Sequence, residues 1–257
     1  DGLWQVMLRP SSRLRPGEPL DLLGYRGKLI LAESLGKGLW SARPEPPAQA
    51  LQILEQIGRT PLPPYIKRSP DSDHQIDRRR YQTVFARCPG SVAAPTAGLH
   101  FNQRMFKNLK AKGIRHTCVT LHVGLGTFAP IATDSIEQHS MHAEWFSISA
   151  QTVASIQTAR SVGHRALAVG TTSLRVLEAA SASGKLHPQQ GWTDIYIKPG
   201  YQFITTDALL TNFHLPRSTL LLLVCALAGP ELIFEAYQQA IAHKYRFYSY
   251  GDAMLIL

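Results

Sequence analysis

The sequence predicts an α/β domain with mostly parallel strands, together with a small antiparallel β unit at its amino end. Residues 1–42 hold short apolar or alternating runs separated by glycine- and proline-containing turns, a spacing typical of antiparallel, barrel-like sheets. From residue 81 onward, strand-like runs alternate with helix-like segments, which favours parallel strands covered by helices. The chain has 257 residues and is 44% hydrophobic, which is enough to bury a core.

The antiparallel unit is expected at residues 1–46. Its strand-like runs lie at 3–8, 20–23, 28–33 and 38–43. Because so short a segment cannot close a barrel, we expect an incomplete one. The chain starts in a strand pattern without an initiator Met, so we also expect that its natural beginning is missing.

Residues 47–80 are expected to connect the two parts. Prolines break the strand pattern, and residues 48–57 then have apolar side chains at helical spacing, ended by Gly58. The charged segment 67–80 has a structural interpretation as a solvated loop. It also contains the best local candidates for phosphate contacts, namely Arg78, Arg79 and Arg80.

The α/β domain is expected at residues 81–257. Strands are predicted at 114–123, 143–148, 165–169 and 194–197. Helices are predicted at 102–112, 149–162, 174–183, 220–228 and 230–244, from apolar spacing and from helix-start residues such as Asn102, Ser218 and Pro230. In parallel sheets, ligands bind beyond the carboxyl ends of the strands, where the connecting loops meet.

The loop at 211–218 leads into a helix that is too uniformly apolar to lie at the surface. It carries Asn212, His214 and Arg217, and Ser218 is a suitable cap. The first backbone N–H groups of a helix are unpaired and partly positive, so a carboxylate or phosphate can bind there. The structural alternative is that Ser218 only caps a core helix and His214 satisfies a loop carbonyl.

Further polar loops border the predicted strands and helices. His100 follows a glycine turn, and His122 ends a strand and precedes glycines that let a ligand approach the backbone. The glycine spacing after His122 is not that of a dinucleotide-binding loop. Residues 170–173 form a possible anion cradle at a helix start, with Arg175 in its first turns. Each loop also has a structural interpretation as a cap or a turn.

Two other stretches have candidate functions. His139, His142 and Glu144 follow the pattern H-x-x-H-x-E, but strand alternation puts only two of them on one side, so no metal site is expected. His142 and Glu144 are alternatively candidates for proton transfer or for orienting one another. Residues 245–254 interleave aromatic side chains with charges, including Asp252. They form either a core-capping tail or a stacking platform for a base.

The composition is that of a soluble, reduced, cytoplasmic protein. The formal net charge of +9 favours a polyanionic partner such as nucleic acid. The three cysteines are far apart and form no C-x-x-C pair, which argues against a disulfide framework and a zinc site. The longest apolar run is about half of the roughly 20 residues that span a bilayer, and no signal peptide is evident, so no membrane association is expected.

Seven blocks of the sequence, in order, resemble the S-adenosylmethionine:tRNA ribosyltransferase-isomerase family of queuosine biosynthesis. Residues 1–42 match that family only in character. The blocks are YQTVFA (81–86), AAPTAGLHF (93–101), LHVGLGTF (121–128), HSMHAE (139–144), GTTSLRVLE (170–178), TNFHLPRSTL (211–220) and YRFYSYGDAMLI (245–256).

The resemblance implies an α/β domain with a smaller antiparallel β-barrel domain inserted in it. It implies transfer and isomerisation of the ribosyl part of S-adenosylmethionine onto 7-aminomethyl-7-deazaguanine at the tRNA wobble position, with release of adenine and methionine. The product is epoxyqueuosine in tRNA. The implied partners are tRNA and S-adenosylmethionine, which is a substrate, so no cofactor and no metal are expected. We expect a monomer.

The implied reaction needs a base beside the sulfonium, a proton for the departing adenine and a neutral attacking amine. The candidate catalytic residues are His100, His122, Glu144, His214 and Asp252. The candidate substrate-binding residues are Thr96, Gly98, Gly124, Gly126, Thr127, Gly170, Thr171, Thr172, Ser173, Arg175, Asn212, Arg217 and Tyr250. The candidate tRNA-binding residues are Arg78, Arg79, Arg80, Lys244 and Arg246.

Two departures from the family pattern bear on activity. The family's Asn-Asn-Thr-Arg motif has no counterpart here, and Arg79 stands where the family usually has an acidic residue. The alternative function is therefore a degenerate or truncated module that binds tRNA or S-adenosylmethionine without turnover. The histidine and glutamate loops favour the enzyme, because simple RNA binding does not need them. An ordinary methyltransferase would need a glycine-rich loop after an early strand, and we find none.

Overall fold

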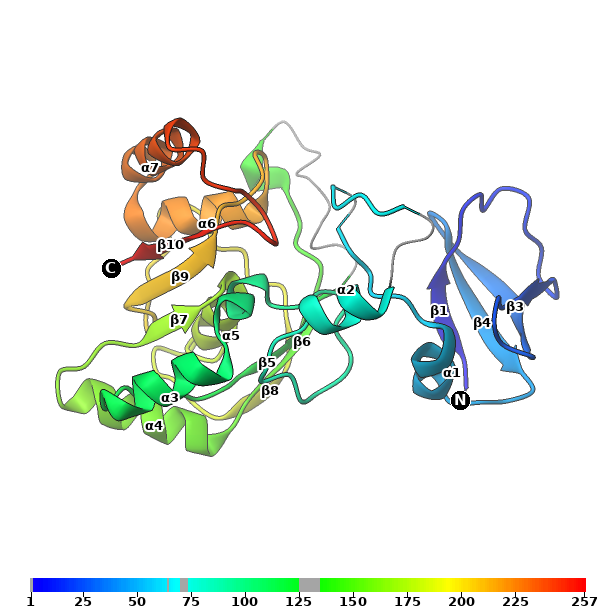
Figure 1. Cartoon of the computed structure of the whole chain (residues 1–257), viewed down its shortest axis with the longest axis horizontal. Coiled ribbons are helices and arrows are strands. Elements are labelled where there is room, and N and C mark those ends of the chain that lie inside the picture. The colour runs from blue at the N-terminus through cyan, green and yellow to red at the C-terminus, as the bar shows by residue number, and fades with distance from the viewer. Residues whose placement is uncertain (1, 64, 70–73, 125–134) are drawn as a thin grey trace. The chain divides into compact units, whose positions relative to one another are not determined.

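A computed structural model describes residues 2–63, 65–69, 74–124 and 135–257. The chain divides into two compact units, Asp1–Thr60 and Pro61–Leu257, drawn in Figure 1. The predicted connection at residues 47–80 is shared between them, because its first helix belongs to the first unit and its second helix to the second unit.

The first unit is an antiparallel sheet with the strand order β1-β4-β3-β2, followed by one helix. Its antiparallel pairing is as predicted. Alternate side chains of the central strands, including Leu29, Leu31 and Trp40, face one side and form its core. The elements are β1 (Trp4–Met7), β2 (Pro19–Asp21), β3 (Lys28–Gly36), β4 (Leu39–Glu45) and α1 (Ala50–Ile57).

The second unit contains two three-stranded sheets, with the orders β5-β6-β8 and β10-β9-β7. Its strands are β5 (Thr120–His122), β6 (Glu144–Ile148), β7 (Leu167–Val169), β8 (Gln189–Thr193), β9 (Ala208–Asn212) and β10 (Ala253–Ile256). Its helices are α2 (His74–Arg80), α3 (Gln103–Ala111), α4 (Ala150–Ser161), α5 (Thr171–Ala179), α6 (Thr219–Ala228) and α7 (Pro230–Ala242), with the 3₁₀ turns η1 (Thr96–His100) and η3 (Ile136–Gln138).

The prediction of mostly parallel strands is wrong for the strands that the structure describes. β6 pairs antiparallel with both β5 and β8, and β10 pairs antiparallel with β9. Among the described strands, only β7 and β9 pair in parallel. A helix between two strands makes them parallel neighbours only if both strands join the same sheet. Here β6 and β7, which flank α4, lie in different sheets.

Two of the predicted strands also differ from the structure. The strand expected at 194–197 is absent, because β8 ends at Thr193. Ile197 is buried in the core and Ile195 packs against it, so the alternation reflects an extended segment lying on the core without a paired neighbour. Of the strand expected at 114–123, only β5 is paired. A hydrophobic pattern reports burial, whereas a strand also needs a partner.

Two helix boundaries differ as well. The segment interpreted as a loop at 67–80 ends in helix α2, whose last turn holds the arginine run. Helix α5 begins at Thr171, directly after Gly170, and not at residue 174 as predicted.

The predicted helix starts at Asn102 and Ser218 are confirmed, and Ser149 caps α4 in the same way. In each case the side-chain oxygen accepts a hydrogen bond from the backbone N–H three residues later. Helices α6 and α7 meet at Gly229, whose φ of +83° is left-handed and favours glycine. They lie next to one another in Figure 1.

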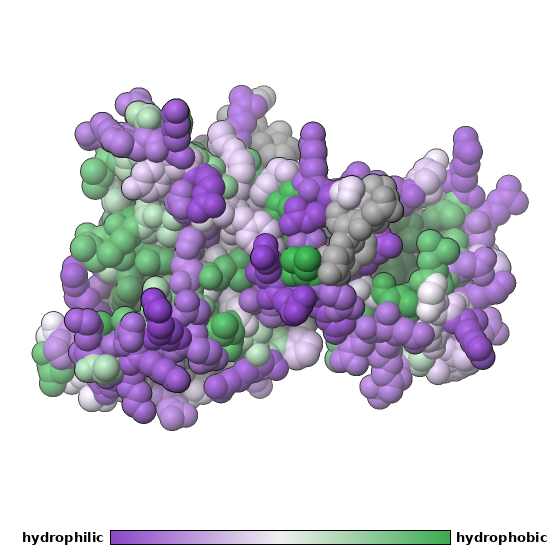
Figure 2. Space-filling view, viewed as in Figure 1, coloured by the Kyte–Doolittle hydropathy of each residue, from purple (hydrophilic) through white to green (hydrophobic). Residues whose placement is uncertain are grey.

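The core of the second unit joins both sheets with α5 and α6. Fully buried members include Phe146, Leu174, Leu209 and Val224. Figure 2 shows mostly hydrophilic residues where α3 and α4 lie. Among the described residues no single helix is long and apolar enough to cross a membrane, although α6 and α7, bent at 114°, meet that test together.

Candidate functional site

A pocket of about 320 Å³ lies in the second unit, where the loops that follow the parallel strands β7 and β9 meet. Gly170 follows β7 and opens α5, while Asn212 ends β9 and leads to α6. The η1 turn and the carboxyl-terminal segment supply the other walls. The expected place for a ligand, beyond the carboxyl ends of parallel strands, thus holds for this one parallel pair.

Residues from five of the seven family-like blocks line this pocket together. Among the predicted site residues, the pocket is lined by Thr96, Gly170, Thr171, Thr172, Arg175, Asn212, His214 and Arg217. These blocks are far apart in sequence, and only the tertiary structure joins them.

Arg175 is the most buried cation of the pocket, with 4% of its surface exposed. Its Nη1 donates to the carboxylate of Glu144, which is 2% exposed. The other oxygen of Glu144 accepts the backbone N–H of Gly124 at 3.2 Å. The remaining donors of Arg175, Nε and Nη2, have no hydrogen-bond partner among the described residues. A buried charged donor without a partner is costly and therefore points to a ligand.

The start of α5 leaves backbone donors open to the same pocket. Its N-cap is Gly170, with φ of +86° and no side chain to accept a hydrogen bond. Thr171 and Thr172 of the first turn line the pocket. Ser173, also a predicted ligand-binding residue, is not among the lining residues, and its hydroxyl donates to the Val169 carbonyl at 2.9 Å.

Asn212 links the η1 turn to strand β9. It is 3% exposed. Its Oδ1 accepts from the Thr96 hydroxyl at 3.1 Å, and its Nδ2 lies 3.2 Å from Nε2 of His100. With the amide as donor, Nε2 of His100 is the acceptor, so the ring proton sits on Nδ1. His100 itself is exposed and does not line the described pocket.

His214 lines the pocket as a neutral imidazole. Burial lowers its pKa to about 4, so it carries no charge at pH 7. Its Nε2 lies 3.1 Å from the Thr211 hydroxyl. Its backbone N–H donates to the Tyr237 oxygen at 2.7 Å, and burial raises the pKa of Tyr237 to about 12, so that phenol stays protonated.

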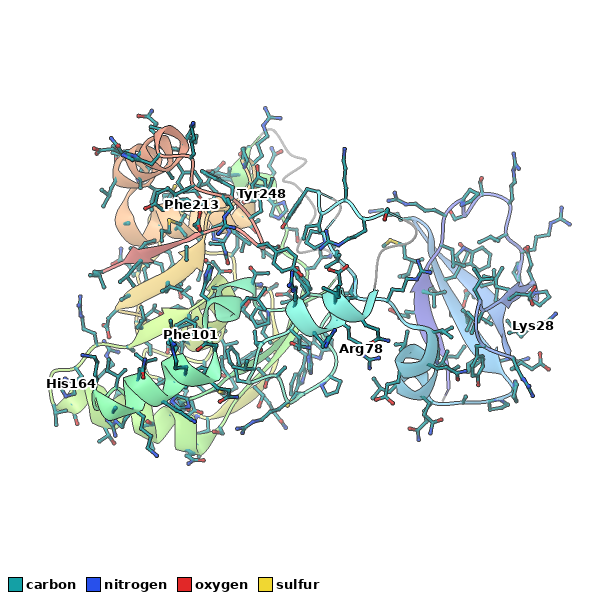
Figure 3. All side chains as sticks on the ribbon, in the orientation of Figure 1. Lys28, Arg78, Phe101, His164, Phe213 and Tyr248 are labelled. Atoms are coloured by element: carbon teal, nitrogen blue, oxygen red, sulfur yellow. The ribbon has the colours of Figure 1, made fainter. Side chains whose placement is uncertain are left out.

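The pocket has an aromatic wall, which contains Tyr248 from the stretch 245–254 and also Tyr65, a residue that was not predicted. Tyr65 and Tyr248 line it with their ring centroids 5.0 Å apart, and the Tyr65 hydroxyl lies 2.5 Å from Oγ of Ser249. Figure 3 shows Tyr248 next to Phe213, whose carbonyl accepts the Tyr248 N–H at 3.1 Å. Tyr248 has a left-handed φ of +71°, a strained backbone of the kind found at functional sites.

The sequence pointed to Tyr250 instead of Tyr248. Tyr250 packs edge-on against Tyr81, with centroids 5.6 Å apart, and is not among the lining residues. The interleaved aromatics indicated a platform, but a sequence pattern does not tell which ring faces the pocket. Tyr65 had no signal, because its partner Ser249 is 184 residues away.

The other candidate catalytic residues lie outside the described pocket lining. His122 stacks on Trp145 at 5.1 Å across the β5–β6 pair. Asp252 accepts from the backbone N–H of Arg246 at 2.8 Å and pairs with its guanidinium at 3.2 Å. These two bonds lower the pKa of Asp252, so it is a weaker proton acceptor than a free carboxylate.

The remaining predicted residues have other positions. Gly98 packs against Phe85, since a Cβ there would come within 2.7 Å of that ring. Among the described residues, nothing lies within 4 Å of a Cβ built on Gly124, while Gly126 and Thr127 lie outside the described residues.

The candidate tRNA-binding residues lie away from the pocket lining. Arg78, Arg79 and Arg80 form the last turn of α2. Lys244 is exposed with a left-handed φ of +58°, and Arg246 is 76% exposed beside Asp252.

The H-x-x-H-x-E stretch does not converge. His139 lies against the Tyr196 ring, 5.5 Å between centroids, whereas Glu144 is buried with Arg175. In the part of the chain that the structure describes, no group of three or more His, Cys, Asp or Glu is placed to hold a metal ion.

The chain is similar to known proteins along nearly its whole length. A family model described as Queuosine biosynthesis protein matches residues 1–256. The S-adenosylmethionine:tRNA ribosyltransferase-isomerase of Cupriavidus pinatubonensis is 57% identical over 211 residues, which cover 82% of this chain and 60% of that protein. The protein of the same name from Moorella thermoacetica is 49% identical over 268 residues, covering 99% of this chain and 73% of that protein.

A solved structure has a similar fold. The crystal structure of the S-adenosylmethionine tRNA ribosyltransferase from Thermotoga maritima matches with a TM-score of 0.52 and 30% identity, over 100% of this chain and 71% of that chain. The chain thus spans 60% of the Cupriavidus relative and 73% of the Moorella relative.

Proposed function

This chain belongs to the queuosine biosynthesis protein family, and we propose that it acts as an S-adenosylmethionine:tRNA ribosyltransferase-isomerase. It would move the ribosyl part of S-adenosylmethionine onto 7-aminomethyl-7-deazaguanine at the tRNA wobble position, isomerise it, and release adenine and methionine. The proposal rests above all on one observation. Five family-like blocks that are far apart in the sequence converge on one pocket, and the guanidinium of Arg175 in that pocket has an edge without a partner among the described residues.

The pocket suits a substrate with an aromatic base and a carboxylate. Tyr65 and Tyr248 offer ring faces for adenine or the deazaguanine. The neutral His214 offers a hydrogen bond to a base edge or to the attacking amine. Arg175 and Arg217 would meet the methionine carboxylate or an RNA phosphate.

Proton transfer would involve a histidine near the pocket. His214 lines it, and His100 is held beside it by Asn212. The low pKa of His214 makes it a weak base at pH 7. His100 would accept a proton only after its Nε2 is released from the hydrogen bond with the Asn212 amide. His122 and Asp252 stay candidates from the sequence, while both lie outside the described lining.

The tRNA would be held by charge. A net charge of +9 attracts the phosphate backbone, and the arginines at the end of α2, with Lys244 and Arg246, are the proposed contacts. Such contacts set affinity but carry no sequence information.

A second candidate is binding of tRNA or S-adenosylmethionine without turnover. One observation favours it: Arg79, in the arginine run of α2, stands where the family usually has an acidic residue, which adds positive charge for binding tRNA and nothing for turnover.

Adenine release tests the proposal. The protein is mixed with S-adenosylmethionine and a tRNA carrying the deazaguanine amine, and products are separated by chromatography. We expect adenine in step with modified tRNA. Salt-sensitive tRNA binding without adenine would support the second candidate, and S-adenosylhomocysteine as the product would overturn both in favour of methyl transfer.

A further inference from the structure

We propose that the free edge of Arg175 and the first turn of α5 form a buried carboxylate subsite for the amino-acid part of the sulfonium substrate, with Glu144 as the residue that positions Arg175. This rests on the proposed function for the identity of the substrate. The subsite itself is inferred from burial and hydrogen bonding.

One nitrogen of the Arg175 guanidinium binds a protein side chain, and the other two form an edge that faces no partner among the described residues. Nη1 donates to Glu144. Nε and Nη2 form the opposite edge, the fork that takes both oxygens of a carboxylate with two parallel hydrogen bonds. Both atoms are buried and have no partner in the described part of the chain, and Arg175 lines the pocket. Because an unmade hydrogen bond at a buried charge is costly, this edge is built for a ligand.

Helix α5 adds donors on the same face. Thr171 and Arg175 are four residues apart and therefore lie one above the other on the helix surface. The Gly170 cap leaves the N–H groups of the first turn without a side-chain acceptor, unlike α3, α4 and α6, whose Asn102, Ser149 and Ser218 accept them. The partial positive charge at this end favours an anion beside Arg175.

The degree of burial selects the kind of anion. Arg175 is 4% exposed, so a ligand must bring a small terminal group to it. The carboxylate at the end of a methionine chain fits that requirement. A tRNA phosphate is joined to a ribose on either side and suits an exposed cation, such as Arg217 at the start of α6. Arg175 therefore takes the carboxylate, and Arg217 is left for RNA.

Glu144 has a positioning role in this arrangement. One of its oxygens holds Nη1 of Arg175 and the other accepts the Gly124 N–H, and the residue is 2% exposed and outside the pocket lining. A carboxylate with both oxygens engaged away from the substrate does not accept the substrate's proton. It orients the guanidinium so that the Nε/Nη2 edge faces the ligand.

The first test compares two ligands on the unmodified protein by titration calorimetry. S-adenosylmethionine and its decarboxylated analogue share the sulfonium and the adenosine and differ in the carboxylate. We expect the decarboxylated ligand to bind about 10- to 100-fold more weakly, the range for a charged hydrogen-bonded pair. Equal affinities, or no binding of either ligand, would overturn the subsite.

Variants then assign the preference to residues. Arg175→Lys keeps the charge but removes the fork, so S-adenosylmethionine should lose most of its advantage over the decarboxylated ligand, whose own affinity should change little. Glu144→Gln should lower the ratio of the affinity for S-adenosylmethionine to the affinity for the decarboxylated ligand. A purely structural role of Glu144 would leave this ratio unchanged. The matched control, Arg217→Lys, should keep the ratio. Loss of the preference in that control, and not in Arg175→Lys, would refute the assignment.

Binding and turnover separate this inference from the proposed function. Carboxylate preference without adenine release would leave the subsite standing and reject the enzyme. Adenine release with equal binding of the two ligands would support the enzyme and reject the subsite.

Discussion

Three buried polar side chains organise one side of the pocket. Arg175, Asn212 and Glu144 are 4%, 3% and 2% exposed. Folded proteins bury such groups when their hydrogen bonds are made, and Asn212 and Glu144 meet that condition within the chain. Arg175 meets it only in part. Asn212 and Glu144 therefore organise the site, whereas Arg175 has donors that a ligand can use.

His214 should make stability depend on pH. Its pKa is about 4 in the folded chain and near 6.5 when unfolded. The unfolded state therefore binds more protons between these values, so the contribution is complete above pH 6.5 and is lost as pH falls toward 4. In urea titrations, we expect His214→Gln to lose less stability than the unmodified protein between pH 6.5 and 4. Parallel curves for the two proteins would contradict this.

Asn212 should be coupled to Thr96. Removing either partner of their 3.1 Å hydrogen bond leaves the other unsatisfied. A double-mutant cycle with Thr96→Ala and Asn212→Ala should give a coupling of about 0.5–1.5 kcal/mol in unfolding free energy. The control pair is Ser149→Ala with Asn212→Ala, whose sites share no hydrogen bond among those described and whose effects should add. Additive effects in the first pair would disprove the coupling.

Helix starts define two walls of the pocket, and they differ in chemistry. Helix α6 is capped by Ser218, whereas α5 begins at a glycine and offers its N–H groups to the pocket. The η1 turn forms a third wall and depends on close packing of Gly98 against Phe85. Gly170 therefore leaves the helix N–H groups open to the pocket, whereas Gly98 allows close packing of the η1 turn.

Gly98 and Gly124 were both predicted to bind substrate. Substitution by alanine, which adds a methyl group, should affect the two positions differently. A Cβ on Gly98 would meet Phe85 at 2.7 Å and Thr83 at 2.9 Å, whereas one on Gly124 would meet none of the described residues within 4 Å. We expect Gly98→Ala to cost about 1–3 kcal/mol of unfolding free energy and Gly124→Ala much less. Thermal melts of the two variants give the comparison, and equal losses would show that packing is not the reason for Gly98.

The cap of α6 should be worth about 1 kcal/mol. The Ser218 hydroxyl accepts the Leu221 N–H at 3.2 Å, so Ser218→Ala removes that bond while Ser218→Asp keeps it. The control Ser149→Ala removes the same kind of cap on α4, whose Ser149 is not a pocket residue. The Ser218 hydroxyl also donates to the Leu215 carbonyl at 2.7 Å, a hydrogen bond that Asp cannot make. Denaturant titrations should therefore show similar losses for the two alanine variants and a smaller loss for Ser218→Asp. A large loss in Ser218→Asp would mean that the cap is not the cause.

The molecule as a whole combines two compact units with a marked positive charge. A charge of this sign acts on a nucleic acid over the Debye length and is screened by salt. The surface that contacts tRNA can therefore be located by removing charged side chains and measuring how the salt dependence of tRNA binding changes.

Neutralising the α2 arginines should reduce the salt dependence of tRNA binding. With Arg78, Arg79 and Arg80 changed to Gln, the slope of log affinity against log salt should fall by about 0.7–0.9 for each phosphate that the protein no longer neutralises. The matched control changes the exposed residues Lys107 and Lys110 of α3 and its C-cap Lys112 to Gln, an equal loss of charge. A larger fall of the slope in the α3 variant would assign the tRNA contacts to that helix instead.

Much of the architecture follows from local sequence. The antiparallel first unit, the caps at Asn102 and Ser218 and the helix opened by Pro230 were predictable because turns, caps and apolar spacing act within a few residues. The family resemblance, carried by short blocks, is confirmed by the match over residues 1–256. The blocks also contained most of the predicted pocket residues.

The tertiary structure decided what depends on distant contacts. Which sheet a strand joins is set by partners far along the chain, so the parallel sheet predicted from alternation became two mixed or antiparallel sheets. The same holds at the pocket, where Tyr65 meets Ser249 and Glu144 meets Arg175. Residue types and their order thus determined the elements and the family. The pairing of buried charges, and the open edge of Arg175, arose only when folding brought those elements together.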